Sequence, residues 1–205
     1  ISFNDVRFDY DENEVLKGVS FKANSDEIIG IVGTSGGGKT TIINLLMRFY
    51  DANNGQILIN QSEISDFELQ SLRQNIGIVT QRIYIFNDTI AANVAYGAKE
   101  IDENRVINAL KVANAWDFVD DMEGGVHAML DEFGANLSGG QRQRIAIARA
   151  LYNEPRILIF DEATSALDNE SERIITDVIE RIRSGRIIFV IAHRQSSIKN
   201  ATKIL

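Results

Sequence analysis

The stretch that decides the fold is IIGIVGTSGGGKTTIINLLMR, residues 28–48. It opens with an apolar run of strand length at Ile28–Val32, passes through a glycine-rich loop over 33–38 and continues as an apolar helix over about 40–48. The loop and the two residues after it fit the pattern G-x-x-x-x-G-K-[ST], in the strand–loop–helix setting that the pattern requires. Given the usual frequency of glycine, a chain of this length would match by accident about once in a hundred. We therefore interpret the stretch as a phosphate-binding loop.

The residue types in this loop each have a chemical reason. Glycines let the backbone curl so that successive N–H groups converge on a β-phosphate. Lys39 supplies a point charge to the β- and γ-phosphates, and the Thr40 hydroxyl is suited to hold Mg²⁺. The candidate nucleotide-binding residues of this stretch are Gly33, Thr34, Ser35, Gly36, Gly37, Gly38, Lys39, Thr40 and Thr41.

Two adjacent carboxylates follow a second buried strand in RILIFDEA, residues 156–163. The apolar run carries the strand to its carboxyl end, which is where open α/β sheets bind their ligands. Asp161 would belong to the magnesium shell, and Glu162 would polarise a water in line with the γ-phosphate as a general base. The alternative is two solvated acids in a loop. The dipeptide alone is weak evidence, but behind a phosphate-binding loop it is strong.

A second anion site is indicated by ANLSGGQRQR, residues 135–144. A small-residue turn, Ser138-Gly139-Gly140, is followed by Gln141 and a predicted helix. A helix N-terminus presents free N–H groups and the positive end of the helix dipole to an anion. One small chain therefore carries two phosphate-binding features, which raises the question of which phosphate the second one holds.

The order of expected elements predicts an α/β fold with a mainly parallel, layered sheet. Residues 1–31 alternate in short β-like runs and predict a small antiparallel sheet at the N-terminus. Residues 82–149 hold almost no strand signal, so we expect a helical subdomain inserted into a single domain over 1–205, with Trp116 in its core. The further strands are expected at 55–60, 76–80, 156–160 and 186–192, and the further helices at 66–75 and 170–183.

The composition is that of an ordinary globular domain, and it excludes several classes of protein. Asp and Glu number 29 against 21 Lys and Arg, so a broad nucleic-acid surface is disfavoured and no nucleic-acid partner is expected. The chain has no cysteine, which excludes disulfides and thiolate metal sites. Its apolar runs are too short to span a bilayer, and it shows no signal peptide. Because both ends fall within strand-like alternations, we interpret the chain as a fragment of a longer polypeptide.

With LSGGQ placed between the phosphate-binding loop and ILIFDEATSALD, the order of motifs resembles the ATP-binding-cassette (ABC) ATPases over essentially the whole chain. The segments LSGGQRQRIAIARAL and DEATSALD are highly specific for that family. LLMRFYD, LRQNIGIVTQ and FNDTIAANVAYG resemble exporters that carry membrane and ATPase parts on one chain, lipid flippases and multidrug exporters above all. The resemblance implies the fold of a P-loop NTPase core with an N-terminal antiparallel β subdomain and an inserted helical subdomain.

The resemblance assigns further residues. Tyr10 matches the aromatic residue that stacks on adenine, and Gln81 matches the glutamine that reaches Mg²⁺ and water and senses the membrane domain. Asp168 matches an acid that acts across a dimer, and His193 matches the histidine that touches the γ-phosphate. Without the resemblance, Tyr10 would be taken for a half-buried sheet aromatic, and His193 would be about equally well explained as a satisfied histidine at a strand end. His127 is expected to be an ordinary surface residue.

Some positions depart from the exporter pattern. Glu132 stands where exporters place a glutamate near the membrane domain, but Asp131 and Phe133 replace the usual glycine and arginine. Gln195 stands where leucine is commoner. These departures concern how ATP chemistry is coupled to the membrane domain, and they leave the ATP chemistry itself untouched.

The resemblance also answers the question of the second anion site. The resemblance implies that two copies stand head to tail and that each ATP lies between the phosphate-binding loop of one copy and Ser138, Gly139, Gly140 and Gln141 of the other. Thr40, Gln81 and Asp161 would hold Mg²⁺, and Lys39, Gln81, Glu162 and His193 would act in hydrolysis. The implied partners are a second copy and a transmembrane domain on the same full-length chain, at the cytoplasmic face of the inner membrane.

Two other functions compete with that of an exporter motor: a soluble ABC ATPase and an importer ATPase. Soluble ABC ATPases that act on DNA insert a long coiled coil before the LSGGQ motif, but only 98 residues lie between Lys39 and Ser138 and no heptads appear. Soluble members that act on ribosomes carry two cassettes, and one is seen here. An importer ATPase on a separate chain is the third possibility, and the exporter-like segment FNDTIAANVAYG argues against it.

Overall fold

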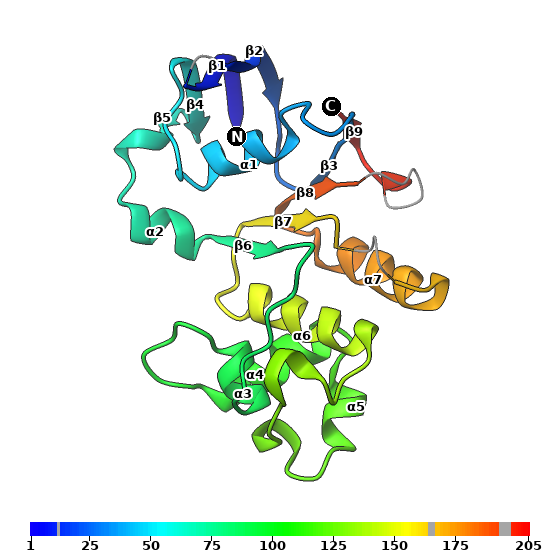
Figure 1. Cartoon of the computed structure of the whole chain (residues 1–205). Helices are drawn as coiled ribbons and strands as arrows, with labels where there is room; N and C mark the ends of the chain where they lie inside the picture. Colours follow the sequence, from blue (N-terminus) through cyan, green and yellow to red (C-terminus); the bar gives the residue numbers. More distant parts are fainter. Residues whose placement is uncertain (12, 164–166, 193–197) are drawn as a thin grey trace.

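The computed structural model describes the chain except for residues 12, 164–166 and 193–197 (Figure 1). Two sheets and two groups of helices make up the described part. The fold class expected from the sequence is confirmed: a parallel sheet and a separate antiparallel sheet combine with helices in an α/β arrangement. No helix in the described ranges is both long enough and apolar enough to cross a membrane.

The parallel sheet has the strand order β6-β7-β8-β3-β9. Its inner strands are short apolar runs, as expected for strands buried on both faces. Side chains alternate between the two faces: Ile29, Ile159 and Phe189 join one core, whereas Leu158 and Ile188 join another. The strands are β3 (Glu27–Ile31), β6 (Ile76–Val79), β7 (Ile157–Asp161), β8 (Ile187–Ile191) and β9 (Lys203–Ile204).

The first core also receives the antiparallel sheet, which has the order β2-β1-β4-β5 and lies with α1 on one side of the parallel sheet (Figure 1). The strand expected at 55–60 belongs to this sheet, because it pairs with β1 rather than with the parallel strands. The strands are β1 (Ser2–Tyr10), β2 (Asn13–Lys22), β4 (Asn54–Ile59) and β5 (Ser62–Glu63).

The second core lies between the parallel sheet and the helices from α3 to α7. Helix α6 contacts α3, α4 and strand β6, so it connects the helices of residues 82–149 to the sheet. The helices are α1 (Lys39–Leu46), α2 (Leu69–Gln74), α3 (Ile90–Val94), α4 (Glu103–Val112), α5 (Trp116–Asp120), α6 (Gly139–Leu151) and α7 (Asn169–Ile182), with 3₁₀ turns at Ile64–Asp66, Gly125–His127 and Glu132–Gly134.

The apolar residues that recur at helical spacing over 104–119 are divided between α4 and α5. Asn114 between them takes a left-handed backbone with φ of 58°, which ends the first helix. Trp116 begins α5 and is only half-buried at the edge of the core, with the Lys111 ammonium 5.4 Å from its ring centre. The sequence predicts Trp116 in the interior of the helical core, but the structure places it at the margin of that core.

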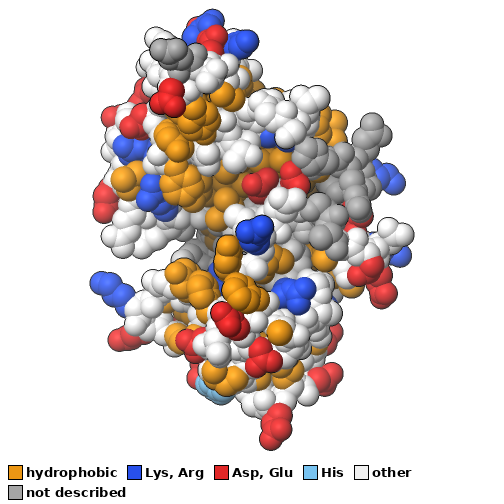
Figure 2. All heavy atoms as spheres, viewed as in Figure 1, with side chains coloured by type: hydrophobic (Ala, Val, Ile, Leu, Met, Phe, Trp, Pro, Cys, Tyr) orange, Lys and Arg blue, Asp and Glu red, His pale blue; other side chains and the backbone are white. Residues whose placement is uncertain are grey.

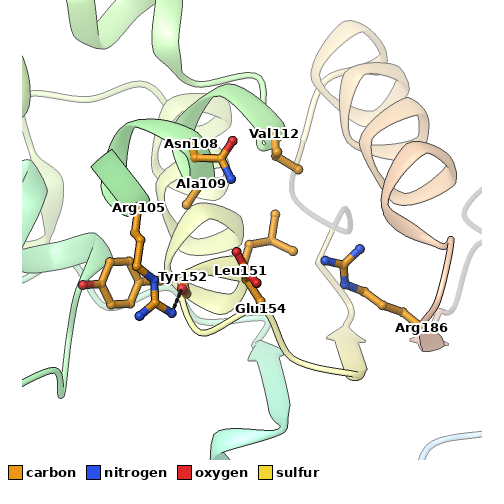
Figure 3. Close-up of a pocket in the computed structure, with 8 residues that line it drawn as sticks. All are labelled: Arg105, Asn108, Ala109, Val112, Leu151, Tyr152, Glu154 and Arg186. Atoms are coloured by element: carbon orange, nitrogen blue, oxygen red, sulfur yellow. Dashed lines mark hydrogen bonds between the residues drawn. The ribbon is translucent and has the colours of Figure 1, made fainter. Parts of the chain in front are cut away.

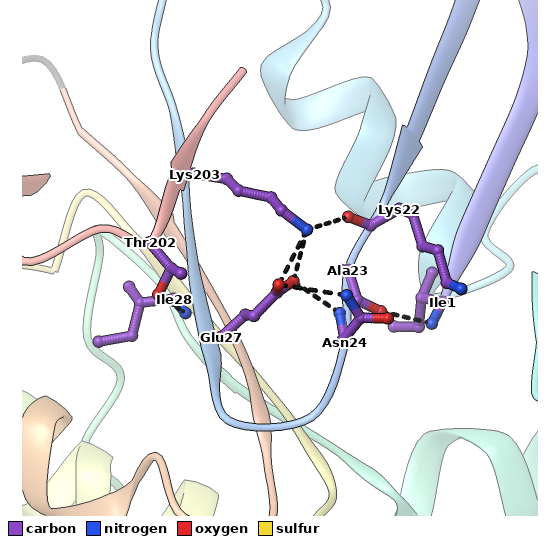
Figure 4. A network of polar contacts seen from close by, with 8 residues as sticks. All are labelled: Ile1, Lys22, Ala23, Asn24, Glu27, Ile28, Thr202 and Lys203. Carbon is purple, nitrogen blue, oxygen red and sulfur yellow. Dashed lines mark hydrogen bonds and ion pairs between the residues drawn. The ribbon is translucent and has the colours of Figure 1, made fainter.

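A polar network joins the N-terminal part of the chain to the last strand (Figure 4). Glu27 accepts from Asn24 N–H at 2.8 Å and pairs with the Lys203 ammonium at 2.9 Å. Lys203 also donates to the Lys22 carbonyl at 3.1 Å, so β2, β3 and β9 meet at one point. The Asn24 N–H bond, followed by the Lys203 bond, lowers the pKa of Glu27 from its ordinary value of 4.5 to about 2.

Candidate functional site

The glycine-rich loop connects β3 to α1 at the carboxyl end of the parallel sheet. Lys39, the first residue of α1, is only 8% exposed, and its ammonium donates to the Gly33 and Thr34 carbonyls at 2.9 Å each. The loop therefore curls around this charge. Gly38 takes φ of 85°, and a Cβ there would lie 2.6 Å from the Leu16 side chain, so any other residue would strain the turn.

The outer surface of the loop is open. The backbone of residues 33–37 is exposed, and a Cβ built at Gly33 or Gly36 would meet nothing within 4 Å. Thr40 is exposed beside this surface, whereas Thr41, the third residue of α1, is buried. The arrangement leaves room for phosphate oxygens over the loop N–H groups, with the lysine charge beneath them.

Gln81 and Glu162 are brought into direct contact. Gln81 lies two residues after β6 and Glu162 one residue after β7, and these strands are parallel neighbours. The Gln81 side-chain amide donates to the Glu162 carboxylate at 2.7 Å. Glu162 has φ of 51°, an uncommon backbone for a non-glycine residue, and its N–H donates to the Ile191 carbonyl at 3.0 Å. Two residues that the sequence placed 81 positions apart thus share one hydrogen bond.

The predicted magnesium ligands are hard oxygen donors of three kinds: the Thr40 hydroxyl, the Gln81 amide and the Asp161 carboxylate. Asp161 ends β7 and Gln81 follows β6, both at the carboxyl edge of the parallel sheet, and Thr40 lies in the first turn of α1, which the glycine-rich loop connects to β3. Within the described ranges, no three His, Cys, Asp or Glu residues gather closely enough to hold a metal ion. Mg²⁺ usually keeps several water ligands and completes its coordination shell with substrate phosphates, so this small set of protein donors fits it.

The Ser138-Gly139-Gly140 turn begins helix α6 with a complete capping box. The Ser138 hydroxyl oxygen accepts from Gln141 N–H at 3.2 Å, and the Gln141 side-chain oxygen accepts from Ser138 N–H at 2.8 Å. Ser138 and Gly139 are exposed, and the N–H groups of Gly139 and Gly140 donate to no acceptor among the described residues. Because the Ser138 oxygen only accepts in the cap, its hydroxyl hydrogen remains available to a ligand.

Asp168 lies beside this turn as the cap of α7. Its carboxylate accepts from the Ser171 N–H and from the Ser171 hydroxyl, each at 2.9 Å, and these bonds lower its pKa. A Cβ on Gly140 would lie 2.6 Å from the Ser171 hydroxyl oxygen. Sequence reasoning did not single out Ser171, although the Asp-x-x-Ser spacing before a helical stripe is a capping signal that identifies it.

Tyr10 ends β1 in a small aromatic group. Its ring is nearly perpendicular to those of Phe8 and Tyr50, with centres 4.7 and 5.2 Å apart. Its hydroxyl accepts from the Asn44 amide of α1 at 3.2 Å, a contact that sequence reasoning missed. His193 and Gln195, which the sequence also singled out, lie outside the described residues.

The loop before α3 and the segments that follow α3 and precede α6 carry an exposed group of large side chains, here called the aromatic surface. Phe86 and Tyr96 stack at 4.6 Å, and Phe133 lies 6.5 Å from Tyr84. Figure 2 shows hydrophobic side chains at the surface of this part of the molecule. The members are Tyr84, Phe86, Tyr96, Met129 and Phe133, which are 40–60% exposed.

Arg149 of α6 supports the aromatic surface from beneath. Its guanidinium donates to the carbonyls of Tyr84 and Asn93 at 2.7 Å each, and to the Asn93 side chain at 2.9 Å. It also lies 5.2 Å from the Phe86 ring centre. Glu132, the residue assigned to coupling, is exposed in the 3₁₀ turn that contains Phe133, and His127 is exposed and paired with Glu103.

Two cavities lie away from these motifs. A small one of about 70 Å³ opens between α4, the end of α6 and the start of β8, where Arg105 stacks on Tyr152 and bonds to its carbonyl at 2.8 Å (Figure 3). A larger one of about 710 Å³ is lined by Ile157 and Ile187, so it lies at the amino ends of the strands. Neither belongs to the carboxyl edge that gathers Lys39, Gln81 and Glu162.

Comparison with known proteins agrees with this geometry. The ABC transporter family model matches residues 16–165. The ATP-dependent lipid A-core flippases of Saccharophagus degradans and Syntrophus aciditrophicus are 50% and 47% identical to the chain over 206 and 205 residues. These alignments cover all of the chain but 35% and 34% of the relatives, so the chain spans about a third of their length.

A solved structure of a bacterial Atm1-family ABC exporter with ATP bound matches the fold with a TM-score of 0.89 at 43% identity. The match covers all of this chain and 36% of that one. The family model includes the glycine-rich loop, the Ser138–Gln141 turn and the Asp161–Glu162 pair. The chain belongs to the ABC transporter family.

Proposed function

We propose that this chain is the ATP-binding and ATP-hydrolysing motor domain of an ABC exporter. One observation carries the proposal: the carboxyl edge of the parallel sheet holds the Lys39 loop and the hydrogen-bonded pair of Gln81 and Glu162. The solved relative at 43% identity has ATP bound, which supports ATP as the nucleotide. We propose one domain over 1–205 with a helical subdomain at about 82–149.

The phosphates of ATP would lie on the open surface of the glycine-rich loop. The N–H groups of 33–38 and the Lys39 ammonium would bind the β- and γ-phosphates, and the Tyr10 ring would stack on adenine. Thr40, Asp161 and Gln81 would hold Mg²⁺, which neutralises developing phosphate charge when bound. The absence of an all-protein metal cluster among the described residues is consistent with a metal that enters with its nucleotide.

Glu162 would act as the general base. Its backbone is fixed by the N–H bond to Ile191, and its carboxylate is oriented by the Gln81 amide. A carboxylate held next to a metal ligand, Asp161, can accept the proton of a water that attacks the γ-phosphorus. His193 is proposed, from the resemblance alone, to contact the γ-phosphate.

A second copy of the chain would complete each ATP site. The exposed turn Ser138-Gly139-Gly140 offers a hydroxyl and two N–H groups without acceptors in the described part of the chain. An isologous dimer places this turn over the partner's glycine-rich loop twice by symmetry. Asp168, exposed beside the turn, would lie at the same interface.

The aromatic surface would dock a transmembrane domain at the cytoplasmic face of the inner membrane. Large exposed apolar groups mark interaction sites, and Gln81, which precedes Tyr84 by three residues, connects the surface to Glu162. The relatives named flippases are about three times as long as this chain, which is consistent with a membrane part on the same full-length protein. Their names favour an amphipathic lipid as the transported substrate.

The test is a pair of substitutions in the full-length protein in lipid vesicles. Glu162→Gln should leave ATP binding intact and lower hydrolysis by about 10²- to 10⁴-fold, as loss of a general base does. Lys39→Ala should weaken MgATP binding itself, measured with a fluorescent ATP analogue. Glu123→Gln, in an exposed turn far from the site, is the control. Hydrolysis by Glu162→Gln within a few-fold of the unmodified protein would overturn the assignment.

A further inference from the structure

We infer that Asn44 is a positioning residue for adenine binding, because it ties the ring of Tyr10 to the helix that begins with the phosphate-binding Lys39. The inference rests on the proposed role of Tyr10 in stacking on the base. It assigns Asn44 no contact with the nucleotide: the asparagine acts through the tyrosine.

Tyr10 is held on two sides by other rings. It is the last residue of β1 and pairs with Asn13 across the hairpin that leads into β2. Phe8, which is buried, and Tyr50, which is exposed, both meet its ring at nearly right angles, 85° and 90°. These contacts confine the ring to the neighbourhood of α1, but apolar edges alone do not fix the direction of its hydroxyl.

The third contact fixes that direction. The half-buried Asn44 amide donates to the Tyr10 hydroxyl oxygen at 3.2 Å, across 34 residues of sequence. Tyr10 stands next to the turn at residue 11, where the backbone is left-handed with φ of 57°, so its own strand ends there and does not continue past the ring. The hydrogen bond therefore supplies a long-range restraint on the ring.

Helix α1 makes this restraint relevant to the nucleotide. Lys39 is its first residue, and Asn44 follows five residues later, about 7.5 Å along the helix axis. A short helix is rigid on this length scale, so the place of the ring is set relative to the lysine that binds phosphate. Removing the Asn44 amide should leave the phosphate contacts intact and release the ring, which must then be ordered again when adenine binds. Immobilising one such side chain corresponds to about a two- to tenfold change in affinity.

A purely structural role of Asn44 in α1 predicts a different pattern of binding affinities. If Asn44 only stabilised the helix, its loss would also disturb Lys39 and would weaken binding of any polyphosphate. It would do so whether or not the Tyr10 hydroxyl were present. Inorganic tripolyphosphate, which has no base, and a double-mutant cycle with Tyr10→Phe separate the two roles.

The experiment measures the dissociation constants of MgATP and of inorganic tripolyphosphate by calorimetry for seven proteins. These are the 205-residue chain and its variants Asn44→Ala, Asn44→Gln, Tyr10→Phe, Tyr10→Ala, the double variant Asn44→Ala/Tyr10→Phe, and Asn108→Ala as the matched control at an exposed position of helix α4. Circular dichroism melting of each variant verifies folding, and Asn44→Leu replaces Asn44→Ala if the latter melts early.

We expect Asn44→Ala and Tyr10→Phe each to weaken MgATP binding about two- to tenfold, the double variant to match either one, and tripolyphosphate affinity to stay unchanged. Asn44→Gln, which keeps an amide donor, should lie nearer the unmodified chain. The inference would be overturned if Asn44→Ala weakened tripolyphosphate binding as much as MgATP binding, or if its effect persisted in the Tyr10→Phe background. The proposed role of Tyr10 would survive either outcome. Unchanged MgATP affinity in Asn44→Ala with clear weakening in Tyr10→Ala would also overturn the inference. Unchanged affinity in Tyr10→Ala would instead remove the proposed role of Tyr10, and the inference with it.

Discussion

At the scale of single residues, Gly140 shows how closely the LSGGQ turn is packed against its own chain. A Cβ at this position would lie 2.6 Å from the Ser171 hydroxyl oxygen and 3.3 Å from its Cβ, whereas at Gly139 the nearest atom would be 3.8 Å away. Ser171 in turn donates to Asp168. The sequence indicated that glycine is needed here to bind an anion. The structure adds a second reason, which is the close packing against Ser171.

We therefore predict that Gly140→Ala lowers the free energy of unfolding by about 1–2 kcal/mol, as overpacking usually does, whereas Gly139→Ala changes it little. Ser171→Ala, combined with Gly140→Ala, should recover part of the loss because the crowded oxygen is removed. Urea denaturation of the four chains measures both effects. Equal effects of alanine at 139 and at 140 would contradict the packing reason.

The contact between Gln81 and Glu162 could not be predicted from the sequence around either residue. Each was identified from its own motif, but their separation of 81 positions gives no sign of contact until β6 and β7 are known to be neighbours. Asn44 and Tyr10 are a similar case, since neither residue type at its position predicts the other. Local patterns identify chemical groups, and strand order decides which groups meet.

At the scale of elements, α6 has a different polar device at each end. Its first turn carries the capping box of Ser138 and Gln141, and its last turn carries Arg149 beneath the aromatic surface. The Asn93 side chain, which is fully buried, donates to the Phe86, Asp88 and Thr89 carbonyls and accepts from Phe86 N–H and Arg149. The loop before α3 is thus built around one asparagine and one arginine.

We predict that Arg149→Met, which keeps the length of the side chain but removes its donors, lowers the free energy of unfolding by about 2–4 kcal/mol. The reason is that three bonds from a half-buried charge are lost and the acceptors on residues 84 and 93 are left without them. Arg173→Met, on the exposed side of α7, is the control. Denaturation with urea, followed by tyrosine and tryptophan fluorescence, would contradict the prediction if the two variants were equally stable.

The polar network around Glu27, where β2, β3 and β9 meet, makes the stability of the fold depend on pH. Because the folded pKa of Glu27 is lowered to about 2, its carboxylate stabilises the fold above pH 4.5, and this contribution is lost as the pH falls through about 2. Glu27→Gln should cost about 1 kcal/mol at pH 7, a modest figure because Lys203 is 41% exposed and solvent screens the pair. The difference from the unmodified chain should shrink between pH 4.5 and 2. If the difference in the free energy of unfolding between the two chains grew on acidification, the predicted direction of the pH dependence would be wrong.

Element boundaries followed from the sequence more closely than element partners did. The helix expected at 40–48 is found at Lys39–Leu46, and the strand expected at 156–160 is found at Ile157–Asp161. Periodicity could not show that the strand near 55–60 leaves the parallel sheet for the antiparallel one, because that choice depends on pairing with β1. It also could not show the break at Asn114, where apolar spacing continues although the helix ends.

At the scale of the whole molecule, the two phosphate-binding features cannot be judged from one copy alone. The Lys39 loop opens at the carboxyl edge of the sheet, and the Ser138 turn is exposed at the N-terminus of α6. Within the described residues neither feature has a hydrogen bond to the other. The proposed head-to-tail dimer gives each turn a use only if it acts on the other copy's nucleotide.

The test of this geometry combines two damaged copies in one assembled transporter. Lys39→Ala removes the phosphate charge of one copy, and Ser138→Arg in the other copy blocks closure over a neighbouring nucleotide without touching that copy's own loop. If the turn acts across the dimer, both lesions fall in the same composite site and the other site stays whole, so beryllium fluoride should trap one nucleotide per heterodimer. If the turn acted on its own chain's nucleotide, each lesion would damage a different site and none would be trapped. The two homodimers, in which both sites carry a lesion under either geometry, serve as controls. Trapping in the heterodimer alone supports the shared site, and its absence there would remove the proposed dimer.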